Sequence, residues 1–392
     1  MDAATTFEFS IASNGIVFGR GTSRQVGQRA RGIGARRVML TTDKQVRGAG
    51  LLDPVEASLR EAGLEVAVFD EISTEPTFDA VHAGVRFLAQ GDFDTIVALG
   101  GGSTIDSSKA FALLAKNGGQ FSDYTRESGF AGTLPQGVPV IALATTSGTG
   151  SDMTRGSGAI DPETGIKYWL VGSPKPAVAI CDPDLTRSMP PHVTANTGTD
   201  ALTQAIESYT SRAVHPLADT LNLEAIRICG TYLRRAVANG DDMEARVAMM
   251  YAASALVGVG FGNKGLHAVH PIAQLVGDRW RIPHGRSLGM LLPQVLEWSL
   301  NGCVDRLGDV AEALGEDVAG LSPRAAAERG IDAVRRILID IGTHDPISKY
   351  GATEADLEKL ARDRVEMLPP NPLWPRPSPT AEDLVGIWRK AL

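Results

Sequence analysis

The chain has 392 residues, of which 43% are hydrophobic, and a net charge of −8. This length predicts about two domains, at roughly 150 residues per domain, with enough apolar side chains for a sizeable core. The charge is spread without a basic tail or stripe, which argues against nucleic acid as a partner. Cys181, Cys229 and Cys303 lie far apart without metal-type spacing, so we expect reduced, packed thiols in a cytoplasmic protein.

The N-terminus has neither the basic region nor the apolar run of a secretory signal. The longest weakly polar run, residues 247–261, is shorter than the ~18 residues that a membrane span needs. We therefore expect no membrane partner.

The N-terminal half alternates short apolar runs with helical patterns. Runs at 7–11 and 16–18 predict two strands joined as a hairpin through Asn14-Gly15. They are followed by a helix from 22 to 32 or 34, a strand at 37–43, a helix at 52–62, a strand at 65–70, a helix at 78–91 and a strand at 95–99. Strands alternating with helices of this length predict a parallel sheet that is covered on both faces.

Two glycine-rich segments follow strands of this half. The first, Gly100-Gly101-Gly102-Ser103, opens a helix, where backbone amides and the helix N-terminus favour a pyrophosphate; a plain tight turn has the same composition. The second, residues 145–152, carries hydroxyls that could bind a nucleotide or simply form a loop. Asp43, at the end of its strand, could accept hydrogen bonds from an adenosine ribose or cap the next helix.

Beyond Pro190 the pattern changes to long helices at 194–211, 219–238 and 242–258, with no convincing strand. We therefore predict an α/β domain over residues 1–190 and an all-helical domain over residues 191–392. In the second domain, Asp200 and the clustered histidines indicate one divalent-metal site assembled from separated helices, because carboxylate and imidazole together suit zinc or iron(II). Gln204 lies one helical turn after Asp200, where such a site usually carries a second ligand.

These segments together resemble the iron-containing alcohol dehydrogenases, the metal-dependent group III family. Four motifs recur in the family's order: the two glycine-rich segments, the Asp200 helix and the turn Pro283-His284-Gly285. The sequence looks most similar to the hydroxyacid-oxoacid transhydrogenase branch, through stretches such as Gly260-Phe261-Gly262-Asn263. The resemblance implies a Rossmann-like N-terminal domain, an all-helical C-terminal domain, and NAD or NADP in the cleft between them.

The resemblance also implies roles for individual residues. For the cofactor these are Gly100 to Ser103 at the pyrophosphate, Thr145, Thr146 and Thr149 at the nucleotide, Asp43 selecting NAD over NADP, and Asp106 and Lys167 near the nicotinamide. Asp200, His270 and His284 match three metal ligands, and Gln204 replaces the fourth, a histidine. Gln274 replaces a further active-site histidine, for which His267 could substitute from the same helical face. Lys167, His270 and His284 are the expected catalytic residues.

The expected reaction is hydride transfer between a nicotinamide and a small hydroxy or oxo substrate whose oxygen is polarised by iron(II) or zinc. Because the neutral amide of Gln204 is a weaker donor than imidazole, the metal could be weakly bound or absent. A metal-independent reductase of the maleylacetate reductase type is then the alternative, as are a dehydroquinate-synthase-like lyase and a non-catalytic NAD-binding relative.

Basic residues near the expected site predict a substrate that carries a carboxylate or phosphonate, since guanidinium groups pair with such anions. A solvated basic face is the other interpretation. The candidate substrate residues are Arg155, Asn263, Lys264, His267, Gln274, Arg279, Arg281 and Arg286. We also expect a homodimer.

Overall fold

The structure is a computed structural model that describes residues 7–11, 13, 15–125, 127–130, 137–170 and 173–392. The chain forms two compact units. One unit is Ile11–Met189, and the other combines Pro190–Leu392 with the described residues up to Ser10.

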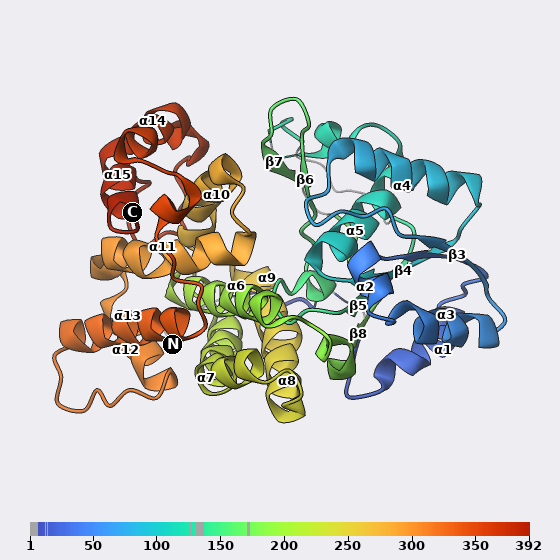
Figure 1. The fold of residues 1–392 in the computed structure, drawn as a ribbon, viewed down its shortest axis with the longest axis horizontal. Coiled ribbons are helices and arrows are strands. Elements are labelled where there is room, and N and C mark those ends of the chain that lie inside the picture. Colours follow the sequence, from blue (N-terminus) through green and yellow to red (C-terminus); the bar gives the residue numbers. More distant parts are fainter. Residues whose placement is uncertain (1–6, 12, 14, 126, 131–136, 171–172) are drawn as a thin grey trace. The chain divides into compact units, whose positions relative to one another are not determined.

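A six-stranded parallel sheet forms the first unit, with the strand order β1–β8–β5–β4–β2–β3, which confirms the α/β prediction (Figure 1). The strands are β1 Ile16–Phe18, β2 Arg37–Thr41, β3 Glu65–Phe69, β4 Thr95–Gly100, β5 Val140–Ala144 and β8 Val178–Cys181. Every residue of β4 and β5 is buried, as expected for central strands that are covered on both faces.

Helices cover both faces of this sheet. Helices α1 (Val26–Gly32) and α3 (Leu52–Glu61) lie on one face, and α4 (Phe78–Gln90) and α5 (Gly102–Asn117) on the other (Figure 1). Because side chains alternate along a strand, Val38 and Leu40 of β2 pack into the core formed with α1 and α3. The short helix α2 (Lys44–Gly48) directly follows β2.

The predicted N-terminal hairpin is wrong. Strand β1 pairs in parallel with β8, with Ile16 opposite Ala179, and residues 7–11 form no strand; Asn14 lies outside the described residues. Phe7 and Phe9 instead pack on the ring of His215, with centroid distances of 4.8 and 5.8 Å. The alternation of apolar residues at 7–9 therefore reflects packing on one imidazole.

Three short strands were not predicted. Besides β8, these are β6 (Gly158–Ile160) and β7 (Lys167–Trp169), which form a two-stranded antiparallel sheet. Strands of three or four residues are too short for a period of two to stand out in a sequence.

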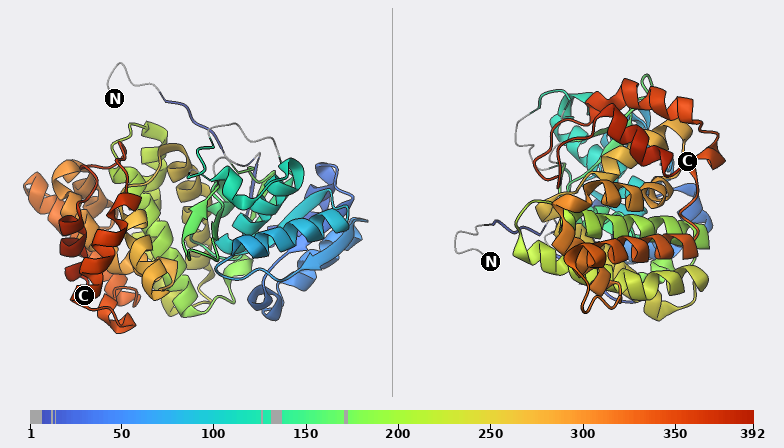
Figure 2. Two further views of the ribbon diagram at one scale, coloured as in Figure 1. Left: turned by 90° about the horizontal axis from the view of Figure 1, so that it is seen from above. Right: turned by 90° about the vertical axis from the view of Figure 1, so that its left-hand side faces the viewer.

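Residues 190–392 contain helices and no strand, which confirms the prediction (Figure 2). The helices are α6 Pro191–Thr210, α7 Pro216–Ala238, α8 Met243–Met250, α9 Val259–Lys264, α10 Val269–Trp280, α11 His284–Ser299, α12 Val304–Ala313, α13 Pro323–Asp340, α14 Glu354–Arg364 and α15 Ala381–Arg389. Helix α6 packs against both α7 and α11. Its buried residues include three polar side chains on one face, Asp200, Gln204 and Glu207.

A π-helical segment, Tyr251–Gly258, joins α8 to α9, so that residues 243–264 are continuously helical. Within the described part of the chain, this is the one helix whose length and composition would suffice to cross a membrane. However, 67% of its most apolar window is buried inside the protein, and a buried core helix meets the same criteria.

Candidate metal centre and nucleotide-binding loops

The predicted cofactor-binding residues gather where β2 and β4 end. Strand β2 pairs with β3 on one side and with β4 on the other, so the chain leaves β2 in one direction and returns on its opposite side. Such a topological switch point is where open α/β sheets bind ligands, beyond the carboxyl ends of their strands. Asp43 follows β2 and Gly101 follows β4, and Thr104 Oγ1 lies 3.5 Å from Asp43 Oδ2.

Close packing requires the glycines of the first loop. A Cβ atom at Gly100 would lie 2.3 Å from Thr104 Oγ1, and one at Gly102 would lie 2.6 Å from Thr149 Cγ2. Gly101 is the N-cap of α5 and has no side chain to cap it, so the first-turn amides of α5 receive no side-chain cap. An uncapped helix N-terminus beside a close-packed glycine loop fits a pyrophosphate group.

The second glycine-rich loop lies against the first. The amide of Thr145 donates to Gly100 O at 3.0 Å, and a Cβ at Gly101 would lie 3.3 Å from Thr146 Cγ2. The two segments that the sequence places 45 residues apart therefore form one surface. Ser103 differs from its neighbours, because its hydroxyl donates its proton to Thr74 O at 2.6 Å, so that its backbone amide is the donor left for a phosphate.

Asp43 has a capping role as well as its place at the switch point. Its Oδ1 accepts hydrogen bonds from the amides of Gln45 at 2.8 Å and Val46 at 2.9 Å, so it is the N-cap of α2. Its Oδ2 faces Thr104. Both interpretations of this aspartate are compatible, because each uses a different oxygen.

Lys109 forms a buried ion pair within α5 and links this helix to residues 151–154. The ammonium of Lys109, which is fully buried, lies 2.9 Å from Asp106 Oδ1 and donates to Ser151 O at 3.0 Å and Thr154 O at 3.3 Å. Asp106 also accepts a hydrogen bond from the Ser151 hydroxyl. The sequence alone indicated no role for Lys109, although it stands three residues after Asp106 on the same helical face.

Lys167 lies in β7, where its ammonium is 3.6 Å from Glu75 Oε2 and 5.4 Å from the ring centroid of Trp169. Glu75 is thus an ionic partner of Lys167 within the α/β unit.

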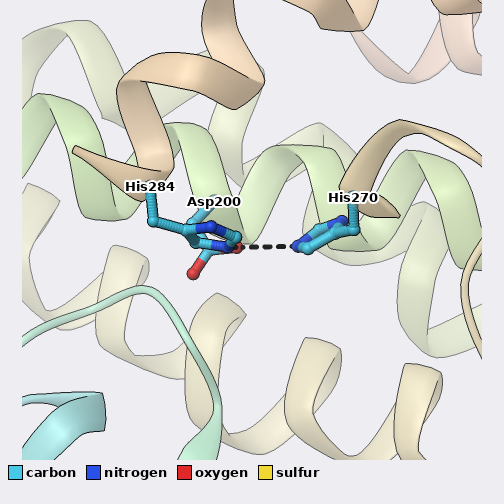
Figure 3. A group of neighbouring side chains, drawn as sticks. All are labelled: Asp200, His270 and His284. Atoms are coloured by element: carbon cyan, nitrogen blue, oxygen red, sulfur yellow. Dashed lines mark hydrogen bonds and ion pairs between the residues drawn. The ribbon is translucent and has the colours of Figure 1, made fainter. Parts of the chain in front are cut away.

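Asp200, His270 and His284 converge in the helical unit (Figure 3). Asp200 lies in the middle of α6, His270 in the first turn of α10, and His284 is the first residue of α11. The Nε2 atoms of His270 and His284 lie 3.2 and 3.9 Å from Asp200 Oδ1, and one ligand atom from each residue falls within 4.8 Å of the others. A carboxylate and two imidazoles at this separation fit zinc or iron(II).

A glycine lets this cluster form. A Cβ at Gly285 would lie 1.9 Å from the carbonyl oxygen of Asn196, so only glycine allows the start of α11 to approach α6 this closely. Gly285 directly follows His284, and Asn196 lies one turn before Asp200. The Pro283-His284-Gly285 turn therefore brings His284 to Asp200 through backbone contact.

Two carboxylates, those of Glu207 and Asp200, hold the imidazole ring of His270 in place. Its Nδ1 contacts Glu207 Oε2, and its Nε2 faces Asp200. Burial by itself would lower the pKa of His270, but the carboxylates of Glu207 and Asp200 outweigh burial and raise this pKa to about 10. Glu207 is fully buried, and the sequence alone indicated no role for it.

Gln204 lies beside the cluster and is bonded to it. Its Nε2 donates to Asp200 Oδ1 at 2.9 Å. As a metal ligand, Gln204 would have to present its carbonyl oxygen, whereas this arrangement directs the amide nitrogen at Asp200. Gln274, on α10, places its Nε2 3.5 Å from Asp278 Oδ2.

His267 is not on the helical face of His270, contrary to expectation. It precedes α10, which begins at Val269, and only 1% of its surface is exposed. Neither ring nitrogen has a hydrogen-bond partner among the described residues. Burial lowers the pKa of His267 to about 4, although the Glu207 charge acts in the opposite direction.

Two of the basic residues expected to bind substrate are already paired. The buried ammonium of Lys264 lies 2.5 Å from Asp219 Oδ1, and Arg286 forms an ion pair with Asp345. Burial lowers the pKa of Lys264 to about 8, and the hydrogen bond to Asp219 opposes that change. Both side chains therefore form ion pairs within the protein, and their charges are already neutralised by Asp219 and Asp345.

The remaining candidates divide between structural and exposed positions. Asn263 binds the backbone of Ser10 through two hydrogen bonds of 2.7 and 2.8 Å, which anchors the N-terminal segment to the helical unit. Arg279 is exposed and stacks on Trp280 at 5.3 Å, and Arg281 is exposed with a left-handed φ of 53°. Arg155 is exposed in the α/β unit.

An α/β unit with a ligand-binding switch point, followed by an all-helical unit with an Asp-His-His cluster, is the fold of the group III dehydrogenases. Models of the iron-containing alcohol dehydrogenase family match residues 13–183, and of its C-terminal region residues 194–392. The chain belongs to the iron-containing alcohol dehydrogenase family.

Several relatives are similar over nearly their whole length. The NAD-dependent methanol dehydrogenase of Bacillus methanolicus is 39% identical over 89% of this chain and 91% of its own. The mitochondrial hydroxyacid-oxoacid transhydrogenase of Bos taurus is 33% identical over 99% of this chain and 91% of its own. Identity therefore does not single out the transhydrogenase branch.

Solved structures agree with this assignment. A 1,3-propanediol oxidoreductase superposes with a TM-score of 0.91 at 33% identity, covering 99% of this chain and 100% of the other. A sulfoacetaldehyde reductase from Bifidobacterium kashiwanohense in complex with NAD+ gives 0.85 at 27% identity, with 99% of each chain covered.

Proposed function

We propose that this protein is a metal- and NAD-dependent dehydrogenase that interconverts a small alcohol with its aldehyde or ketone. The observation that carries the proposal is the convergence of Asp200, His270 and His284 within 4.8 Å of one another. Relatives named as NAD-dependent methanol dehydrogenase and 1,3-propanediol dehydrogenase support the same reaction class.

In this proposal the α/β unit binds the dinucleotide. The amides at the start of α5 would hold the pyrophosphate, and Thr145, Thr146 and Thr149 would face the nucleotide from the adjoining loop. Asp43 Oδ2 would accept from the adenosine ribose, and its charge would disfavour the 2′-phosphate of NADP. Asp106, fixed by Lys109 and Ser151, would face the nicotinamide end together with Lys167.

The helical unit would hold the metal through Asp200, His270 and His284. A divalent zinc or iron(II) ion, when bound there, supplies Lewis acidity that lowers the pKa of an alcohol. With Asp200, His270 and His284 as its only protein ligands, such an ion would remain accessible to the substrate. Gln204 would stabilise Asp200 through its 2.9 Å hydrogen bond, and its replacement of a histidine leaves zinc or iron(II) less tightly bound.

We further propose that the substrate carries a carboxylate or a similar anion. Fewer basic residues support this proposal than the sequence implied, because Asp219 neutralises Lys264 and Asp345 neutralises Arg286. Arg279 and Arg281 remain, since both are exposed, in the last turn of α10 and at its C-cap, and neither has a salt bridge among the described residues. Exposed guanidinium groups of this kind pair with carboxylates in bidentate fashion.

The reaction class is tested by following the absorbance of NADH and NADPH with a panel of anionic and neutral aldehydes and alcohols. Oxidation of NADH by at least one aldehyde is expected. Binding of NADH without turnover of any carbonyl would favour a non-catalytic relative, and elimination from a phosphorylated substrate would favour a lyase. Equal turnover of neutral and anionic aldehydes would refute the anionic-substrate proposal.

Metal dependence is tested on the same protein after chelation and re-addition of zinc or iron(II). Activity should disappear and return, and His284→Ala should abolish the return. The control His192→Ala changes an exposed histidine in the first turn of α6 and should behave as the wild type. Full activity in metal-free protein would establish the metal-independent alternative.

We also propose that the protein is cytoplasmic and forms a homodimer. Size-exclusion chromatography with light scattering tests the homodimer.

A further inference from the structure

We infer that Glu207 is a positioning residue of the metal site, acting through His270. Its carboxylate is fully buried on α6, seven residues after Asp200. Oε2 contacts His270 Nδ1, while Oε1 accepts hydrogen bonds from the amides of Val269 at 2.6 Å and His270 at 3.2 Å. The two oxygens of Glu207 thus hold both the backbone and the ring of one residue.

This contact determines which nitrogen of His270 binds a metal. A carboxylate oxygen only accepts hydrogen bonds, so Nδ1 must carry the proton that it shares with Glu207. The remaining nitrogen, Nε2, lies 3.2 Å from Asp200 Oδ1 on the side of the cluster, and a metal held between Asp200 and His270 would take the place of its proton. A carboxylate behind a ligating imidazole fixes its tautomer and ring orientation and makes the coordinating nitrogen more basic.

The geometry of α6 explains why one helix supplies both a candidate metal ligand and the carboxylate that orients another ligand. Residues at i, i+4 and i+7 share a helical face, so Asp200, Gln204 and Glu207 lie on one face of α6. Asp200 contributes a ligand atom, Gln204 donates to Asp200, and Glu207 orients His270. A displacement of α10 relative to α6 would therefore disturb the ligand and its support at once.

A purely structural role for Glu207 makes a different prediction. Two of its hydrogen bonds satisfy amides at the start of α10, and such capping contributes to stability whether or not a metal binds. A cap alone would affect the unfolding temperature of the metal-free protein but not the metal affinity of the folded protein. The two readouts separate the roles.

The inference rests on the metal site proposed above, and the experiment keeps the two apart. The full chain is freed of metal and titrated with Co²⁺ and Zn²⁺ against a competing chromophoric chelator, with thermal unfolding of the metal-free protein measured in parallel. If the wild type binds neither ion, the proposed metal site fails. If the wild type binds and the variants below bind equally well, only the inference about Glu207 fails.

Glu207→Gln keeps the shape and an acceptor oxygen but removes the charge, and should weaken metal binding by about 10- to 100-fold. Glu207→Asp keeps the charge with a shorter reach and should lie between this variant and the wild type. The d–d absorption of bound Co²⁺ should change in both variants. The matched control is Asp242→Ala, which removes the N-cap of α8 and should lower the unfolding temperature without changing the metal affinity.

A measurement on the wild type keeps the inference testable if the variants do not fold. In Zn²⁺-loaded protein with ¹⁵N-labelled histidine, the His270 ring should carry a proton on Nδ1 and coordinate through Nε2. Coordination through Nδ1, or metal affinities of the Glu207 variants within twofold of the wild type, would overturn the inference.

Discussion

The amide nitrogen of Gln204 donates to Asp200 Oδ1 across 2.9 Å. The residue that replaces a histidine in the family's pattern is thus bound to a neighbouring candidate ligand, one helical turn away on α6. Because Gln204 contacts a candidate ligand directly, we expect a substitution at position 204 to change the metal affinity of the site.

Gln204→His should strengthen the binding of zinc or iron(II) by at least about tenfold, because imidazole is a better donor than an amide for these ions. Competition with a chromophoric chelator measures the change. Gln90→His, at the exposed end of α4, is the control for a non-specific effect of an added histidine. Equal affinities for the wild type and Gln204→His would show that position 204 does not face the metal.

His267 should make the protein sensitive to acid. Its pKa is lowered from 6.5 to about 4 by burial, so the unfolded chain binds the proton more readily than the folded protein. Stability is therefore complete above about pH 6.5 and is lost as the pH falls towards 4, by on the order of 3 kcal/mol.

His267→Leu tests this, since leucine has a similar volume and no nitrogen that lacks a hydrogen bond. The variant should be at least as stable as the wild type at pH 7 and should lose less stability between pH 6.5 and 4, as measured by urea unfolding. It should also retain metal binding. His192→Leu, at an exposed position, is the control. Loss of metal from His267→Leu would make His267 a ligand and contradict the arrangement of Asp200, His270 and His284.

Asp43→Asn should improve NADPH binding by about fivefold to tenfold, because removing one charge near the ribose relieves a repulsion on the order of 1 kcal/mol. Asparagine is also a good N-cap, so α2 should remain intact and NADH binding should change little. Fluorescence titration with both cofactors measures this. Asp53→Asn, in the exposed first turn of α3, provides the control. An unchanged preference would place the ribose elsewhere.

Lys109→Met should destabilise the protein by about 3 kcal/mol, because it leaves Asp106 without its ionic partner in a buried setting. Adding Asp106→Asn should recover part of this loss. Lys116→Met, on the exposed surface of the same helix, should change stability by less than about 0.5 kcal/mol. Urea unfolding compares the variants, and equal effects at positions 109 and 116 would argue against a buried ion pair.

The sequence predicted most elements of the fold because their signals are local. Alternating strands and helices indicated a parallel sheet, and the change of pattern after Pro190 indicated an all-helical region. The hairpin at 7–18 failed because the partner of β1 is β8, about 160 residues further along the chain. A strand's own residues show that it is extended, but they do not name its neighbour.

The candidate sites divide in the same way. Residue type indicated a metal site at Asp200 and the clustered histidines, and the family resemblance selected His270 and His284 among them. The glycines before α5 indicated a phosphate site, because a glycine-rich turn before a helix is a local signal. Tertiary packing decided the partners of the histidines and lysines near the site. Glu207 contacts Nδ1 of His270, and Asp219 neutralises Lys264. His267 is enclosed without a hydrogen-bond partner in the described part of the chain. The distribution of charge and hydrogen bonds depends on contacts between distant segments, which only the folded chain brings together.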